Sequence, residues 1–105
     1  MLVEKKKYEV GQVVSIKIAN GDEIIAKLVS EDDDGFVLSR PMALIPSQNG
    51  MMMVAALISV DSKDDIRLEK RHIMLHGPTK ENIADGYREQ TTGIQAVRKS
   101  GIITG

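Results

Sequence analysis

Apolar and polar residues alternate with a period of two along the first part of the chain. Over residues 13–19 the apolar positions include Val14, Ile16 and Ile18, and residues 23–31 repeat the pattern. This spacing is typical of β-strands that turn one face to the core and the other to water. The sequence therefore predicts a strongly bent three-strand meander, with strands over residues 13–19, 23–31 and 35–45.

Turn geometry decides how the first two strands pair. The Asn-Gly dipeptide at residues 20–21 is a strong signal for a two-residue hairpin loop. That loop would pair Ile18 with Glu23 and place the two apolar rows on opposite faces. A loop one residue longer pairs Ile18 with Ile24 and keeps both rows on one face. We therefore predict the three-residue loop.

The second turn contains three successive aspartates at residues 32–34. A three-residue loop at this point pairs Leu28 with Leu38 and puts Phe36 on the same face. Gly35, which has no Cβ, is expected to adopt a positive φ. The apolar face thus continues through all three strands.

The stretch from residue 51 to residue 60 is apolar almost without interruption. A strand with one solvated face would alternate, so both faces of this strand are expected to be covered. The cover is either the C-terminal helix or another copy of the chain. Ile25 and Val29 point outward from the earlier strand, which favours a neighbouring copy. An adaptable methionine-rich ligand groove is the alternative interpretation.

A helix is expected after the sheet. Short strands are predicted at residues 66–68 and 73–75, and Thr79 is placed as the N-cap of a helix that ends near Gln90. Tyr87 lies on the apolar face of this helix. The expected organisation is a basic lead-in over residues 1–9, a barrel over 10–77, a helix over 78–93 and a tail over 94–105.

Acidic and basic residues are nearly balanced in the chain of 105 residues, with 14 Lys and Arg against 15 Asp and Glu. There is thus no overall attraction to nucleic acid, and any anion-binding site must be a local patch. The absence of cysteine excludes disulfides and thiolate metal sites and fits a reducing compartment. No signal peptide or membrane span is apparent. We expect a cytoplasmic, single-domain protein.

Three lysines at residues 5–7 form a short basic lead-in. Such a segment is most often a solvated terminus. The alternative is an arm that contacts phosphates, whose effect would multiply in a ring of several copies.

No arrangement of residues typical of catalysis or metal binding stands out. His72 and His76 are separated by an expected turn and strand, too far apart for a shared metal. The acidic segment over residues 31–35 lacks the later glutamate of a calcium loop. There is also no nucleophile elbow and no phosphate-binding glycine loop. The sequence predicts a protein that is not an enzyme and needs no cofactor or metal.

Two segments resemble the motifs of Sm and Sm-like proteins. The first is Ile18-x-x-Gly21-x-x-Ile24-x-Ala26-x-Leu28, followed by Asp32 and by Val37-Leu38. The second spans residues 68–73, where Lys70 precedes Ile73 by three positions as in the Tyr-Lys-His-Ala-Ile run of the bacterial Sm-like RNA chaperone. The ending with Tyr87 and Thr92-Gly93-Ile94 looks like Sm-like proteins of tailed phages of marine cyanobacteria. The resemblance covers residues 10–94.

The resemblance implies a mainly β fold, a small five-stranded, strongly bent antiparallel Sm-like barrel with one C-terminal helix. It also implies a closed homo-oligomeric ring, because in this family the fourth strand pairs with the fifth strand of the next copy. The residues that it places at this interface are Met51, Met52, Met53, Val54, Ala55, Ile73, Met74 and Leu75.

A site for single-stranded RNA is implied as well, because in the family the two motif loops meet around the ring pore. The corresponding residues here are Lys70, Arg71, His72, Asp32, Gly35 and Phe36. The chain departs from the family at Ala26, usually a glycine, and at Glu69, usually an arginine, and the asparagine of the first loop is replaced by Gly35 or Phe36. Poor discrimination between bases is therefore expected.

Two functions remain open at this point. One is a ring that binds single-stranded RNA weakly, as an RNA chaperone or regulator. The other is a structural or adaptor ring, for example in phage assembly, that has lost the RNA site. The expected partners are other copies of the chain and single-stranded RNA, with no membrane and no small-molecule substrate.

Overall fold

The computed structural model describes residues 8–93. Their secondary structure consists of β1 (Val13–Ile18), β2 (Glu23–Glu31), β3 (Gly35–Ser47), β4 (Gly50–Ala55), β5 (Ile66–Glu69), the 3-10 turn η1 (Lys70–His72), β6 (Ile73–Pro78), α1 (Glu81–Arg88) and the π-helical turn η2 (Glu89–Gly93). The predictions that fall on residues 1–7 and 94–105 lie outside the described residues.

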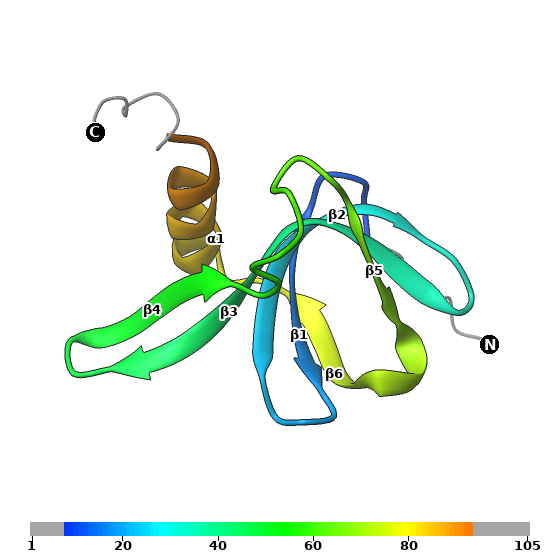
Figure 1. Cartoon of the computed structure of the whole chain (residues 1–105), viewed down its shortest axis with the longest axis horizontal. Coiled ribbons are helices and arrows are strands. Elements are labelled where there is room, and N and C mark those ends of the chain that lie inside the picture. Colours follow the sequence, from blue (N-terminus) through cyan, green and yellow to red (C-terminus); the bar gives the residue numbers. More distant parts are fainter. Residues whose placement is uncertain (1–7, 94–105) are drawn as a thin grey trace.

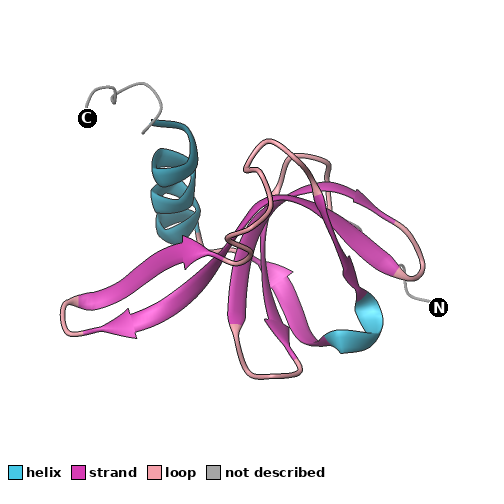
Figure 2. Cartoon of the chain, in the orientation of Figure 1, coloured by secondary structure: helices cyan, strands magenta, loops and turns pink. Residues whose placement is uncertain are grey.

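All strands belong to one antiparallel sheet with the order β4-β3-β2-β1-β6, and β5 also pairs with β3. Strands β1, β2, β5, β6 and the first part of β3 curl into a barrel, whereas the hairpin of β3 and β4 projects beyond it (Figure 1). Helix α1 stands against this hairpin, on one side of the barrel (Figure 2). The predicted mainly β, strongly bent antiparallel fold with one C-terminal helix is confirmed, although the number of strands differs.

The strand predicted over residues 51–60 is shorter in the structure. Strand β4 ends at Ala55, and the following loop exposes Ile58 by 89%. Strands β4 and β5 then pair with successive parts of β3, first with residues 42–47 and then with residues 35–38. The prediction of one continuous strand was wrong because the ladder on β3 is interrupted around Pro41, which has no N–H to donate.

The first hairpin has a register that differs by two residues from the prediction. Ile16, not Ile18, pairs with Ile24, and the Gly21 N–H donates to the Ile18 carbonyl at 2.8 Å. Gly21 adopts φ 97°, a conformation that favours glycine. A shift of two residues preserves the face of every side chain. The core-facing row was therefore predicted correctly even though the pairing was wrong.

The second hairpin pairs Leu28 with Leu38, as predicted. Gly35 has no positive φ, contrary to the prediction. A Cβ at this position would instead lie 2.8 Å from Arg67 Nη2 and 2.9 Å from the Leu68 carbonyl oxygen. Glycine is needed here because β5 approaches the backbone closely.

The core has two parts, one on each face of the sheet. Inside the barrel, the buried side chains include Phe36, Ile16 and Leu38. On the outer face, Ile25 packs with Ala84, Tyr87 and Val13 beneath helix α1. The prediction that a neighbouring copy covers Ile25 was therefore wrong, because the helix of the same chain covers it.

The helix begins and ends differently from the prediction. Its N-cap is Lys80, and Thr79 instead pairs its hydroxyl with that of Ser15 at 2.7 Å. After Arg88 the backbone continues as the π-helical turn through Gly93. The helix therefore does not stop near Gln90.

A bulge in β3 is fixed by the helix. Arg40 has φ 47°, and within residues 8–93 it is the one non-glycine residue with a positive φ. The Tyr87 hydroxyl accepts a hydrogen bond from the Lys27 N–H at 3.2 Å and lies 2.8 and 2.9 Å from the carbonyl oxygens of Ser39 and Arg40, to which it donates. Burial raises the pKa of this hydroxyl, which keeps it protonated as a donor.

Candidate functional site

The structure brings together the two turns that the sequence predicted as an RNA site. The turn between β2 and β3 lies beside η1, and the Lys70 N–H donates to the Asp34 carbonyl oxygen at 2.8 Å. Within the first turn, the Asp32 carboxylate accepts hydrogen bonds from the N–H groups of Asp34 and Gly35. The two turns therefore form one surface.

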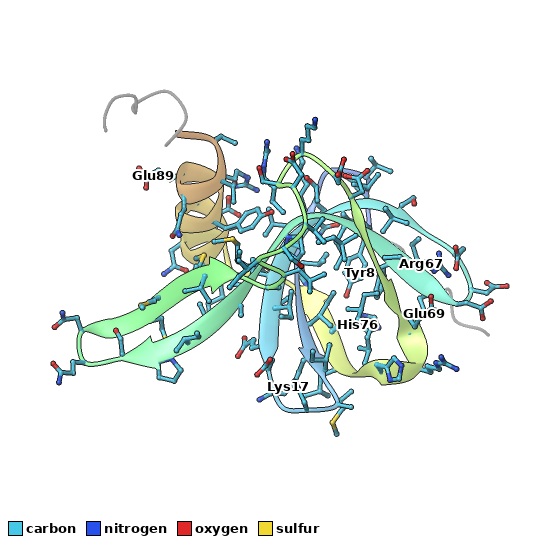
Figure 3. All side chains as sticks on the ribbon, viewed as in Figure 1. Tyr8, Lys17, Arg67, Glu69, His76 and Glu89 are labelled. Carbon is cyan, nitrogen blue, oxygen red and sulfur yellow. The ribbon has the colours of Figure 1, made fainter. Side chains whose placement is uncertain are left out.

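Arg67 is the centre of this surface, and no sequence pattern predicted its role. Its guanidinium donates to both Asp32 oxygens, at 2.9 and 3.1 Å, and to Glu69 Oε2 at 2.7 Å. Figure 3 shows Arg67 and Glu69 next to each other at this end of the barrel. The hydrogen bond from Arg67 holds the pKa of the Asp32 carboxyl well below its usual range, and the same contact raises the pKa of Arg67. Asp32 is thus occupied by contacts within the chain.

Replacing Asp32 by Asn is expected to change how stability depends on pH. Because the folded-state pKa of Asp32 is depressed, its contribution is present above the unfolded carboxyl pKa of about 3.9 and disappears as the pH falls through the lower folded value. Calorimetry should show Asp32→Asn melting below the wild type near pH 7, with the gap closing below about pH 4. Asp33→Asn is the matched control and should melt like the wild type. A gap that stays constant down to pH 2 would contradict this role of Asp32.

The side chains of Lys70 and Phe36 both make contacts within their own chain. Lys70 Nζ lies 2.7 Å from Glu31 Oε2 and 5.1 Å from the centre of the Phe36 ring. Phe36 itself has 0% of its surface exposed. The buried Phe36 ring therefore packs against Lys70 and has no surface that a ligand could contact.

Asp32, Arg71 and His72 are the exposed members of the predicted RNA site. Unlike Asp32, the Arg71 and His72 side chains form no ion pair or hydrogen bond within residues 8–93. A shallow cavity of about 530 Å³ lies beside Arg71. Five carboxylates occur in these two turns and the adjoining strand ends, against three cations: Glu31, Asp32, Asp33, Asp34 and Glu69 against Arg67, Lys70 and Arg71. The surface is acidic overall.

His76 takes part in an aromatic cluster at the edge of the barrel. Its Nδ1 lies 2.7 Å from the Tyr8 hydroxyl, and its ring meets the Phe36 ring edge-on at 5.4 Å. Tyr8 and His76 are seen beside each other in Figure 3. Burial, followed by the charge of Glu31, raises the pKa of Tyr8. His76 is therefore held by aromatic contacts.

The part of the chain that the structure describes contains no cluster of three or more His, Cys, Asp or Glu residues suited to a metal. In the same part, no helix is long and apolar enough to cross a membrane.

The predicted interface residues occupy two strands that each have a free edge. Within residues 8–93, strand β4 pairs with β3 alone and β6 with β1 alone, although Gln90 Nε2 donates a hydrogen bond to the Met53 carbonyl oxygen of β4 at 3.1 Å. Met53 packs beneath helix α1 and Ile73 packs against the barrel core, so both are partly covered by their own chain. The remaining six are exposed: Met51, Met52, Val54, Ala55, Met74 and Leu75.

The sequence matches no protein-family model, and no curated protein matches it. Among solved structures, the chain is similar to a heptameric archaeal Sm protein, with 15% identity and a TM-score of 0.49. The similarity covers 68% of this chain and 90% of that one. A phage origin stays a prediction.

Proposed function

We propose that this protein works as a ring of identical copies, in which β4 of one copy pairs with β6 of the next. The observation that carries the proposal is the presence of two free sheet edges with exposed apolar side chains. On β4 these are Met51, exposed by 54%, and Met52, by 46%; on β6 they are Met74, by 65%, and Leu75, by 66%.

Free edges of this kind are unfavourable in a monomer. An unpaired strand leaves N–H and C=O groups without strand partners and readily pairs with another chain. Pairing one edge with the different edge of a second copy is a head-to-tail contact, which closes into a ring when the rotation between copies allows it. It would also bury apolar side chains that now face water, a favourable change.

Sedimentation velocity tests this assembly. The wild-type chain at micromolar concentration should sediment as one species with several times the mass of the 11.5 kDa chain. A monomer at that concentration would refute the ring. An open-ended series of sizes would mean that the edges pair without closure.

For the ring we propose weak binding of single-stranded RNA, without catalysis, at the surface formed by the two turns. Arg71 and His72 support this role because their side chains are exposed and available to phosphates and bases. Repetition around a ring would multiply a contact that is weak in one copy. Steep dependence on salt is expected because the attraction is electrostatic.

A second candidate function is a structural or adaptor ring that binds no RNA. The observation that favours it is the excess of carboxylates around Arg67 and Lys70, both of which are held in ion pairs at 2.7–2.9 Å. Carboxylates so close to the turn repel phosphates. The acidic surface would suit a basic protein partner better.

Titration of a fluorescent single-stranded RNA separates these two functions. The double variant Lys70→Ala with Arg71→Ala should lower RNA affinity by at least about tenfold, because each copy loses the available Arg71 charge and also the Lys70 charge that offsets the Glu31 carboxylate. The control, Lys17→Ala with Lys63→Ala, removes the same charge from other exposed positions and should change affinity little. Wild-type protein that binds no RNA even at low salt would leave the adaptor ring as the function.

A further inference from the structure

A second, smaller cavity lies between helix α1 and the outer face of the sheet, apart from the two turns. Its volume is about 240 Å³, and Lys27, Arg40 and Arg88 line it together with Ser39 and Tyr87. The cations come from β2, β3 and α1 respectively. No carboxylate lines this cavity in the part of the chain that is described. Its charge is opposite to that of the surface around Arg67.

The charges of this cavity are largely uncompensated. Neither Lys27 nor Arg40 forms an ion pair within residues 8–93. Arg88 pairs only with Asp85, at 3.0 Å, and both side chains are more than half exposed, so the pair is weak and exchangeable. Glu89 lies on the outer side of the helix, turned away from the barrel (Figure 3). An anion in the cavity would thus lie near three cations, of which only Arg88 is paired with a carboxylate in the described residues.

Two further carboxylates lie beyond Arg40. Asp61 and Asp64 line a larger cavity that Arg40 also borders. Neither of them forms an ion pair with Arg40. Arg40 therefore borders both cavities, and its charge is not paired with either aspartate.

Tyr87 connects the backbone segments that carry the three cationic residues. Its hydroxyl binds the backbone of Lys27 and of Arg40, and Arg88 is the next residue in the helix. The Arg40 charge lies close enough to oppose the rise in the pKa of Tyr87 that burial causes. The backbones of Lys27 and Arg40 are thus both held by one buried hydroxyl, and Arg88 follows Tyr87 directly in the helix.

Arg40 occupies this position at a cost to the backbone. A φ of 47° is unfavourable for a residue with a Cβ, and glycine or asparagine would adopt it more easily. Backbone strain of this kind is concentrated at binding sites, where the surrounding structure enforces it. An arginine kept in such a conformation, beside a cavity with two other cations, points to a role for its side chain.

We propose that Lys27, Arg40 and Arg88 form a binding site for a phosphate group. Guanidinium groups match phosphate oxygens with paired hydrogen bonds, and lysine adds a point charge. The cavity is smaller than the usual range for drug-sized ligands and suits one oxyanion with a few waters. The phosphate belongs either to a free anion or to the backbone of single-stranded RNA. The site lies within one copy and does not depend on the ring.

Titration with inorganic phosphate at constant ionic strength tests the site. In amide NMR spectra of deuterated, ¹⁵N-labelled protein, the signals of Lys27, Arg40 and Arg88 should shift and saturate. The signals of Lys17 and Lys63, two exposed lysines outside both proposed sites, serve as an internal reference and should not saturate. Shifts that grow without saturation and to the same extent at all five residues would overturn the proposal.

Two matched double variants sharpen the result. Arg40→Gln with Arg88→Gln should weaken phosphate binding by at least about tenfold, because two charge-assisted contacts are lost. Lys17→Gln with Lys63→Gln removes the same charge elsewhere and should leave binding within about twofold. Unchanged amide signals away from the cavity verify the fold of each variant. Equal loss in both double variants would contradict a specific site.

A short single-stranded RNA then identifies the source of the phosphate. Saturable shifts of the cavity amides with RNA assign the site to the nucleic-acid backbone, whereas saturation with inorganic phosphate alone assigns it to a small phosphorylated molecule. Saturation with neither refutes the site. Sedimentation and the Lys70 and Arg71 variants test the ring and the two turns separately, so each proposal can fail without the other.

Discussion

Replacing Phe36 by Ala is expected to lower the stability of the protein strongly rather than to weaken RNA binding by a folded chain. The Phe36 side chain has no exposed surface, and its aromatic ring packs against the rings of Tyr8 and His76. Truncation of a buried phenylalanine to alanine costs about 3–5 kcal/mol, because apolar contacts are lost and a cavity remains. A small domain has only about 5–15 kcal/mol of net stability.

Thermal unfolding followed by circular dichroism measures this effect, and the melting temperature should fall by more than about 15 °C. Phe36→Leu preserves most of the volume and should cost less than about 1.5 kcal/mol. RNA affinity per folded Phe36→Leu molecule should equal that of the wild type. A Phe36→Ala protein that keeps its melting temperature but loses RNA binding would show that the Phe36 side chain contacts RNA directly.

The second large effect is expected at the two free sheet edges. Met52→Lys on β4 or Leu75→Lys on β6 places an ammonium group where the proposed contact would exclude water. An unpaired buried charge costs several kcal/mol, so each contact should weaken by about a hundredfold or more. Sedimentation velocity should show monomers for each variant under conditions where the wild type forms the ring.

Val10→Lys is the control for this pair of variants. Val10 is 77% exposed and lies outside β4 and β6, so the same change from an apolar side chain to lysine should leave the assembly intact. Monomers from Val10→Lys would mean that added charge alone disperses the copies. Intact assemblies from both Met52→Lys and Leu75→Lys would exclude contact between these edges.

The candidate site was predictable only in part. The turn of Lys70, Arg71 and His72 was assigned to the site through its resemblance to a family motif, and the structure places it beside the turn that holds Asp32. Arg67 could not be found, because its partner Asp32 lies 35 residues earlier in the chain. Ion pairs between distant segments depend on which strands become neighbours, and no local pattern encodes this.

The sequence alone determined which face each strand turns to the core. A period of two fixes the face independently of the exact register, which is why Val14, Ile16 and Ile24 are buried although the first hairpin pairs two residues away from the expectation. The position of the helix after the sheet was likewise readable from local residue preferences.

Only the tertiary structure decided how the apolar run after Gly50 is used. Its residues predict one strand over 51–60, but the ladder along β3 is interrupted near Arg40 and Pro41, so β4 ends at Ala55. The bulge itself is maintained by Tyr87, more than 45 residues away in the chain. A bulge held by a distant hydroxyl cannot be predicted from local preferences, because its stability comes from hydrogen bonds that form only after the helix has packed on the sheet.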